Sequence, residues 1–139
     1  MSLPSYNTLK VGDAIPSLVK KPINRTTLAL FAGASNDHNP IHIDIDFAKK
    51  SGFDDVFVHG MLVMAYLGQV LTNWTAQTNI REFSTRFKAI TNLGDELSCK
   101  GIVQEKMERN GEQCVKLALS VTNQAGDEKL AGSAIIAVS

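Results

Sequence analysis

The segment from Gly60 to Trp74 constrains the fold more than any other part of this sequence, because it is apolar on nearly every side of a helix. Its apolar residues are Met61, Leu62, Val63, Met64, Ala65, Tyr66, Leu67, Val70 and Leu71. A helix of this kind is normally buried, since no face of it is suited to water. We therefore expect the rest of the chain to enclose this helix.

The sequence after this helix alternates between apolar and polar residues, which is typical of strands with one face on a core. From position 79 onwards the alternating residues are Phe83, Thr85, Phe87 and Ala89. Further strands are predicted over residues 96–105, 113–121 and 129–138, with Asn, Gly and Asp residues in the turns between them. Four strands after one buried helix predict an α+β fold in which a curved antiparallel sheet is wrapped around a long central helix.

The region before the helix is predicted to contain shorter elements. Residues 1–17 are predicted to be a loop and residues 17–23 a first strand. Asn24 is a good N-cap for a helix over residues 25–35, and a single helical turn is predicted over 46–50, ended by Gly52. The apolar face of the first of these helices is predicted to consist of Leu28, Leu30, Phe31 and Ala34. The 139 residues show no repeat or linker, so we expect one domain over 1–139.

The segment from Asp37 to His42 holds a carboxylate and an imidazole five positions apart, with Pro40 between them. Proline has no backbone N–H and disfavours the α conformation of Asn39, so a preceding helix must end near Asp37. The chain then bends, and we expect His42 to turn back towards Asp37. A carboxylate and an imidazole that share one water are suited to general acid/base chemistry.

Composition excludes several classes of protein. Lys and Arg together number 14, as do Asp and Glu, and this zero net charge argues against a dedicated nucleic-acid binder. The longest apolar run, residues 61–67, is far shorter than the ~20 residues that cross a bilayer. Residues 1–10 lack the apolar core of a signal peptide. We expect a cytoplasmic protein that binds neither membrane nor nucleic acid, with Cys99 and Cys114 as small buried side chains.

The spacing of two histidines superficially resembles that of a metal site. His38 and His42 are four residues apart, as zinc ligands on a helix often are, but Pro40 interrupts the helix that would align them. We therefore predict no metal. Met61, Met64 and Trp74 are predicted to be core residues.

The quoted segments resemble a known family. Residues 37–42, Asp-His-Asn-Pro-Ile-His, are similar to the hydratase signature of MaoC-like dehydratases and (R)-specific enoyl-CoA hydratases, which reads Asp, any residue, Asn-Pro, an aliphatic residue and His. Residues 58–61, Val-His-Gly-Met, resemble the family's landmark at the start of its long helix. Residues 86–88 and 94–96 are similar to its strand-and-turn segment. The likeness extends from about Lys10 to the C-terminus.

The resemblance implies a hot-dog fold and reversible addition of water to a trans-2-enoyl-CoA, giving the (R)-3-hydroxyacyl-CoA. It implies that Asp37 and His42 are the acid/base pair and that the backbone amide of Gly60 binds the thioester carbonyl. No cofactor is implied beyond the CoA of the substrate, and acyl carrier protein is an alternative carrier. Domains of this family pair through their sheets, with acyl-thioester sites near the interface, so a homodimer or higher homo-oligomer is expected.

Other residues are expected to have supporting roles, and some of them have two interpretations. Asn39 and Pro40 are expected to support the turn. His59 either orders the helix entry, which we favour, or lines the pocket. Arg86 and Lys88 either meet the CoA phosphates or belong to a solvated face.

This chain departs from the family pattern at three positions. Asn36 stands where glycine is frequent, Ile90 replaces a common proline, and Gly68 lacks a side-chain hydroxyl and is expected to widen the acyl tunnel. An acyl-CoA thioesterase and a non-catalytic acyl-thioester-binding subunit of a hetero-oligomer remain as alternative functions.

Overall fold

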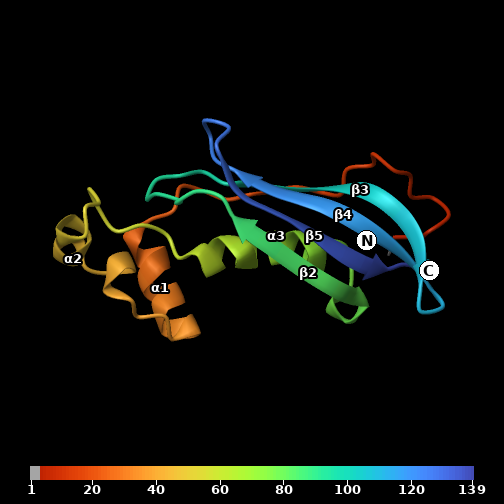
Figure 1. Ribbon diagram of the computed structural model, residues 1–139, viewed down its shortest axis with the longest axis horizontal. Helices are drawn as coiled ribbons and strands as arrows, with labels where there is room; N and C mark the ends of the chain where they lie inside the picture. The colour runs from red at the N-terminus through yellow and green to blue at the C-terminus, as the bar shows by residue number, and fades with distance from the viewer. Residues whose placement is uncertain (1–3) are drawn as a thin grey trace.

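A five-stranded antiparallel sheet forms one layer of the protein, and a long helix lies along it (Figure 1). The computed structural model describes residues 4–139. The strand order is β1-β3-β4-β5-β2, so β2 and β1 are the edges. The strands are β1 (Leu18–Val19), β2 (Ile80–Phe87), β3 (Ser98–Arg109), β4 (Glu112–Thr122) and β5 (Glu128–Ala137).

The long helix, α3 (Gly60–Trp74), supplies much of the core. Leu67 and Leu71 have no exposed surface, and they pack with apolar residues of β3, β4 and β5, including Val103, Leu117 and Ile136. The predicted α+β hot-dog fold, a curved antiparallel sheet around a long helix, is confirmed. The 3-10 helix η2 (Gln77–Asn79) connects α3 to β2.

Helix α3 is less completely enclosed than its sequence predicts. Met61 is 54% exposed, so the prediction that it is a core residue is wrong. Met64 and Trp74 are partly buried and pack against the core, as predicted. The sheet covers one side of the helix, and the apolar side chains on its other side remain accessible in the single chain.

The strand boundaries differ most from the predictions at two places. The predicted strand over 17–23 is only two residues long, because Pro22 has no amide to donate and the chain leaves the sheet to start the first helix. Strand β3 extends to Arg109, beyond the predicted end at 105. Asn110 and Gly111 both have positive φ, 51° and 79°, as in the two-residue turns that join long hairpin strands.

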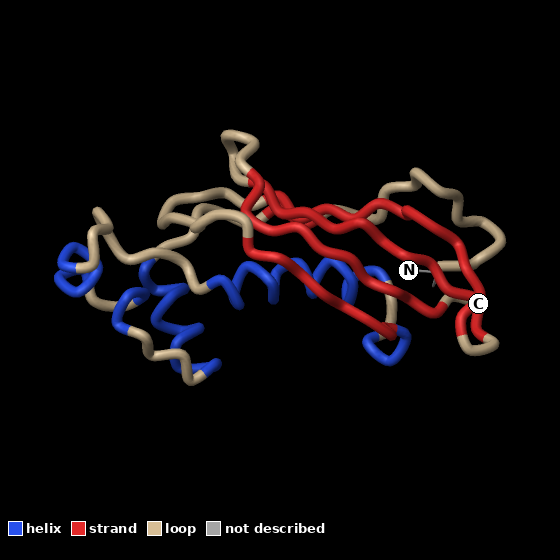
Figure 2. Tube along the Cα trace, in the orientation of Figure 1, coloured by secondary structure: helices blue, strands red, loops and turns tan. Residues whose placement is uncertain are grey.

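A helical lobe made of α1 (Arg25–Ser35), η1 (Pro40–His42) and α2 (Ile45–Lys50) lies beyond one end of the sheet (Figure 2). The Asn24 side chain accepts a hydrogen bond from the Thr27 amide, which confirms it as the N-cap of α1. The predicted apolar face of α1 is partly wrong. Leu28 and Ala32 are buried, whereas Leu30 is 70% exposed and Ala34 is exposed, because α1 touches the rest of the protein along only one narrow side.

The N-terminal segment runs as a loop beside β3, as predicted. Ala14 forms an isolated bridge with Ile102, and the Gly12 amide donates to the carbonyl of Val103. Residues 1–3 of that predicted loop lie outside the described residues. Cys99 and Cys114 are buried and unpaired, as predicted. Over residues 4–139, none of the helices is both long and apolar enough to span a membrane.

Candidate active site

The turn that follows α1 places Asp37. Asn36 ends the helix in the left-handed conformation, with φ 61°, which asparagine tolerates better than most residues and which glycine adopts freely. The Asp37 amide then donates to the Ser35 hydroxyl, and Oδ1 of Asp37 accepts from the Asn39 amide at 3.3 Å. The Asn39 side chain accepts from the Ile41 amide at 3.0 Å and so caps η1, which Pro40 begins. These contacts fit the supporting role expected of Asn39 and Pro40.

His42 is held by a backbone carbonyl from another segment. Its Nδ1 lies 2.7 Å from the carbonyl oxygen of Phe57, and its side chain packs edge-on against the Phe57 ring. A carbonyl can only accept, so Nδ1 carries the proton in the neutral ring and Nε2 has a free lone pair. His42 is only 9% exposed, so this orientation is fixed by its surroundings.

The structure brings Asp37, His42 and His59 together, and we call them the histidine cluster. Each offers a nitrogen or carboxylate oxygen that lies within 4.8 Å of those of the other two. The expectation that His42 turns back towards Asp37 is therefore confirmed, and His59 joins them from the start of α3.

His59 contacts both members of the predicted pair. Its ring is stacked on that of His42, with centroids 4.0 Å apart and planes 25° apart. Its Nε2 lies 3.2 Å from the backbone carbonyl oxygen of Asp37, and the Phe31 ring packs edge-on against it. Burial lowers the pKa of His59 below its usual value, and the neighbouring His42 lowers that pKa further.

The helix-entry interpretation of His59 holds for its backbone and not for its side chain. The His59 carbonyl accepts from the Leu62 amide at 3.0 Å, but the imidazole makes no capping hydrogen bond to α3. His59 is also absent from the walls of the adjoining pocket described below.

The histidine cluster is poorly shaped for a metal ion. A metal needs lone pairs that converge on one point, whereas the stacked rings of His42 and His59 direct their in-plane lone pairs almost side by side. Nε2 of His59 donates to the Asp37 carbonyl, so Nδ1 holds the one lone pair of that ring. The expectation of a metal-free site remains a prediction.

Gly60 follows directly and begins α3. Its backbone amide has no acceptor within residues 4–139, and the residue is exposed. A Cβ at this position would lie 2.9 Å from Cε1 of Phe87, so glycine allows a close approach of side chain and ligand that alanine would hinder. The free amide and the positive end of the α3 dipole make this point attractive to a carbonyl oxygen that gains negative charge.

A pocket of about 320 Å³ opens beside Gly60. Its lining is largely apolar and comes from the segment before α3, the end of β2 and the start of β5: Phe57, Val58, Gly60, Val63, Phe87, Lys88, Ala89, Ile90, Thr91, Lys129 and Leu130. Asp37 and His42 do not line this pocket. Two of its lining residues connect it to the histidine cluster: Phe57, whose carbonyl oxygen accepts from His42, and Gly60, which follows His59 in the chain.

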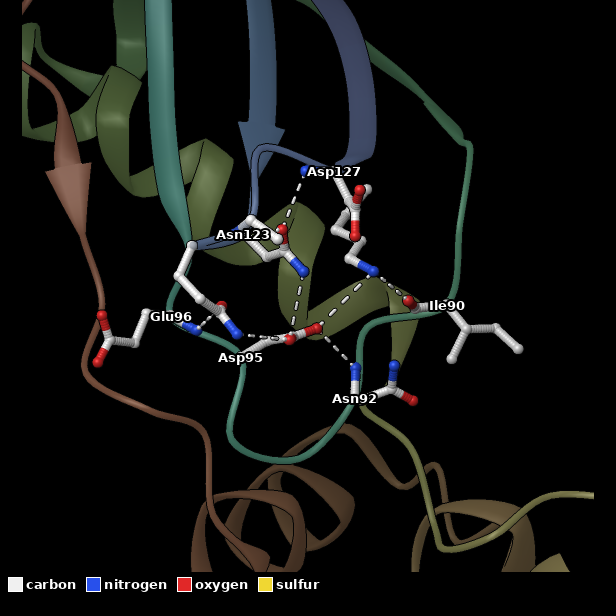
Figure 3. A network of polar contacts seen from close by, with 9 residues as sticks. Ile90, Asn92, Asp95, Glu96, Asn123 and Asp127 are labelled. Atoms are coloured by element: carbon white, nitrogen blue, oxygen red, sulfur yellow. Dashed lines mark hydrogen bonds and ion pairs between the residues drawn. The ribbon is translucent and has the colours of Figure 1, made fainter.

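Buried polar groups fix one wall of this pocket, and we call them the pocket-wall network (Figure 3). Lys129 is 6% exposed, and its Nζ donates to the carbonyl of Ile90 at 2.8 Å and lies 3.8 Å from Oδ2 of Asp95. The same Asp95 oxygen accepts from the Asn92 amide at 2.9 Å. Oδ1 accepts from the side chains of Asn123 and Gln124. The network ties the segment 90–95, which begins with the wall residues Ile90 and Thr91, to the turn between β4 and β5.

The remaining predicted residues lie away from the histidine cluster. Gly68 faces Phe83, which a Cβ would meet at 3.5 Å, and it does not line the pocket. Lys88 pairs with Glu128 at 2.8 Å, Arg86 is exposed on β2, and His38 is exposed.

The sequence interpretation missed two contributors. The Phe57 carbonyl is a backbone group and leaves no trace in a sequence. Lys129 stood in a predicted strand, where a lysine is normally assigned to the solvent side.

Comparison with known proteins shows what the chain is similar to. The family described as MaoC like domain matches residues 8–125. The mitochondrial 3-hydroxyacyl-[acyl-carrier-protein] dehydratase of Arabidopsis thaliana is 31% identical over 103 residues, which cover 74% of this chain and 60% of that protein. The (R)-specific enoyl-CoA hydratase of Rhodospirillum rubrum is 35% identical over 107 residues, covering 73% of each chain.

A solved structure supports the same relationship. The unliganded R-hydratase PhaJ1 of Pseudomonas aeruginosa superposes with a TM-score of 0.83 at 31% identity, covering 97% of this chain and 86% of that one. The likeness therefore includes the lobe with α1 and α2 as well as the sheet.

Proposed function

This chain belongs to the MaoC-like domain family, and from that premise we propose that it is a hydro-lyase that adds water reversibly to the double bond of a trans-2-enoyl thioester. The product is the (R)-3-hydroxyacyl thioester, and the reverse reaction is a dehydration. The observation that carries the proposal is the meeting of the Asp37 carboxylate and the His42 imidazole next to the free Gly60 amide.

Asp37 and His42 are proposed to bind and activate one water. The bare Nε2 of His42 accepts a proton from water while the water oxygen forms its bond to C3 of the substrate. A carboxylate and a neutral imidazole are both proton acceptors, so the proton that C2 receives is the one that water gave up. The pair returns it there, and the net change is one water added across the double bond. A positioned acid/base pair of this kind contributes about 10²–10⁴-fold in rate.

The Gly60 amide is proposed to bind the thioester carbonyl. Negative charge moves onto this oxygen when water attacks C3, and a donor that is already in place stabilises it. One such donor is typically worth about 2.7–4 kcal/mol. The adjoining apolar pocket is proposed to hold the part of the substrate next to the thioester.

The carrier is proposed to be CoA, with acyl carrier protein as the alternative, because relatives of both kinds are similar to this chain. No cofactor is proposed. We further propose a homodimer or higher homo-oligomer, because β2 is an unpaired edge strand and carries Phe87, which is 56% exposed. Light scattering that reports a monomer at micromolar concentration would contradict that assembly.

The test follows the ultraviolet absorbance of the conjugated enoyl thioester, with crotonyl-CoA and a longer enoyl-CoA. We expect it to fall with the wild type, leaving the thioester intact and forming the (R)-alcohol. Asp37→Asn and His42→Gln are each expected to lower kcat by at least ~10²-fold with little loss of stability. Matched controls are Asp46→Asn on α2 and His38→Gln, both exposed and outside the histidine cluster.

Three results would count against the proposal. Wild-type rates in folded Asp37→Asn or His42→Gln would remove these residues from the chemistry. Release of free thiol would indicate a thioesterase. Stable co-purification with a second chain and no turnover alone would instead favour the acyl-thioester-binding subunit.

A further inference from the structure

His59 is the residue of the histidine cluster to which the proposed chemistry gives no task. It has no exposed surface, and it touches Asp37 through a hydrogen bond and His42 through a ring stack. We propose that His59 is a positioning residue that holds the Asp37 turn and the His42 ring in register with each other. The kinetic part of this inference rests on the proposed function, whereas the contacts themselves do not.

The hydrogen bond to Asp37 fixes the tautomer of His59. The Asp37 carbonyl accepts, so Nε2 of His59 must carry the proton. On the other side of the same residue, the Asp37 amide donates to the Ser35 hydroxyl. Within residues 4–139, His59 thus supplies the one long-range hydrogen bond to the Asp37 backbone, while Ser35 holds that backbone locally and the Asn39 amide donates to the Asp37 carboxylate.

The stack on His42 requires an uncharged partner. Burial and the neighbouring His42 both lower the pKa of His59, while the Asp37 carbonyl and carboxylate act in the opposite direction. A neutral ring can lie against His42 whether that residue is an imidazole or an imidazolium. A second cation at 4.0 Å would oppose the protonation of His42 that the reaction needs.

The other ring nitrogen shows that shape alone does not explain this residue. Within residues 4–139, Nδ1 of His59 is the one buried side-chain nitrogen or oxygen without a hydrogen-bond partner. An unpartnered buried acceptor is costly, and a phenylalanine would fill the same space without it. The histidine is therefore explained by what its Nε2 proton does for Asp37.

Two substitutions separate the two contacts. His59→Phe keeps a ring that can stack on His42 and removes the donor to Asp37, whereas His59→Gln keeps an N–H donor and removes the ring. We expect each to lower kcat for enoyl-CoA hydration by at least about tenfold, since misplacement by about 1 Å can cost ~10²-fold. KM is expected to change less than threefold, because the pocket walls are untouched. His38→Gln is the matched control.

A spectroscopic measurement tests the contacts without relying on activity. The chain has three histidines, so ¹⁵N NMR of the imidazoles resolves each tautomer. We expect the wild type to show a neutral His59 protonated on Nε2 and a His42 protonated on Nδ1 when neutral. His59→Gln is expected to alter the His42 signals, and His59→Phe is expected to alter the Asp37 carbonyl signal.

The outcomes are distinguishable. A wild-type His59 that is protonated on Nδ1, or charged at pH 7, overturns the inference even if neither variant folds. So do wild-type kcat values in both folded variants. If the wild type hydrates no enoyl thioester, the proposed function fails, and the His42 and Asp37 signals in the variants still decide whether His59 positions them.

Discussion

The histidine cluster and the pocket-wall network are both buried and polar, yet they differ in how completely their groups are bonded. In the pocket-wall network, the Asp95 carboxylate accepts from one backbone and two side-chain donors, and the Lys129 ammonium donates to the Ile90 carbonyl. In the histidine cluster, by contrast, Nδ1 of His59 has no partner among residues 4–139, and the lone pair on Nε2 of His42 has none there either.

This difference separates a structural role from a chemical one. Buried polar groups normally find partners during folding, because an unpaired one costs free energy. A network in which each buried group has a protein partner therefore stabilises the fold and is poorly suited to bind a ligand. Buried polar groups without a hydrogen-bond partner destabilise the fold. Such groups are expected where a substrate or water forms the missing hydrogen bonds. The Gly60 amide at the adjoining pocket is exposed rather than buried, but it too has no acceptor within residues 4–139 and so remains available to a ligand.

The largest expected effect is a loss of stability when the pocket-wall network is broken. Lys129→Met leaves the buried Asp95 carboxylate without its cation and the Ile90 carbonyl without its donor. We expect the free energy of unfolding to fall by about 3 kcal/mol, because removing one partner of a buried ion pair exposes the other to an apolar surrounding. Urea unfolding measures it.

The matched control for that change is Lys88→Met. Lys88 also lines the pocket, but its pair with Glu128 is about half exposed, so the loss should stay within about 1 kcal/mol. Equal losses in the two variants would contradict the structural role of Lys129. A kcat loss in folded Lys129→Met as large as that of Asp37→Asn would place it in the chemistry instead.

The next largest effect is expected at Gly60, where a substitution should lower activity and not stability. Gly60→Ala places a methyl group 2.9 Å from the Phe87 ring, beside the free amide, and hinders the approach of a thioester carbonyl. We expect kcat/KM to fall by about 10²-fold, the lower end of the loss of one oxyanion donor. The stability of the single chain should change little, because the Phe87 side chain is 56% exposed there and can move aside.

Gly33→Ala is the control for this variant. Gly33 lies in α1, and a Cβ there meets nothing within 4 Å. We expect unchanged activity and a gain of up to about 1 kcal/mol from the better helix propensity of alanine. Full activity in folded Gly60→Ala would remove its amide from the proposed mechanism.

The sequence was informative wherever a pattern is local. The apolar residues of α3 and the alternation in β2 to β5 predicted the α+β fold, and Asn24 and Pro40 predicted where α1 begins and why it must end near Asp37. Predictions failed where tertiary packing decides. The exposure of Leu30 depends on which side of α1 meets the rest of the protein, and the loss of the strand beyond Val19 depends on where the chain must turn.

In the candidate site, too, the residues in local motifs were predictable and the long-range contacts were not. Asp37, His42 and Gly60 stand in recognisable local motifs, and the structure brings the first two together. The anchor of His42 is the Phe57 carbonyl, which any residue type would offer. Lys129 and Asp95 are 34 positions apart, and no local pattern indicates that a lysine and an aspartate at this separation are buried as a pair. The contact of His59 with both members of the pair likewise exists only in the folded chain.

The smallest expected effect concerns pH and tests whether the histidine cluster is costly for the fold. The pKa of His59 is lowered from about 6.5 in the folded protein, mainly by burial, so below that pH the unfolded chain binds a proton at His59 that the folded chain does not. The unfolded state then binds more protons, and stability falls as the pH falls from about 6.5 towards the folded pKa. The loss cannot exceed about 1.4 kcal/mol per pH unit for one group.

His59→Phe should lose less stability than the wild type between pH 7 and pH 5 in urea unfolding. Equal losses would mean that His59 is as easily protonated in the folded protein as in the unfolded chain. The contrast with the pocket-wall network, in which each buried group has a partner, would then rest on the free groups of His42 and Gly60 alone.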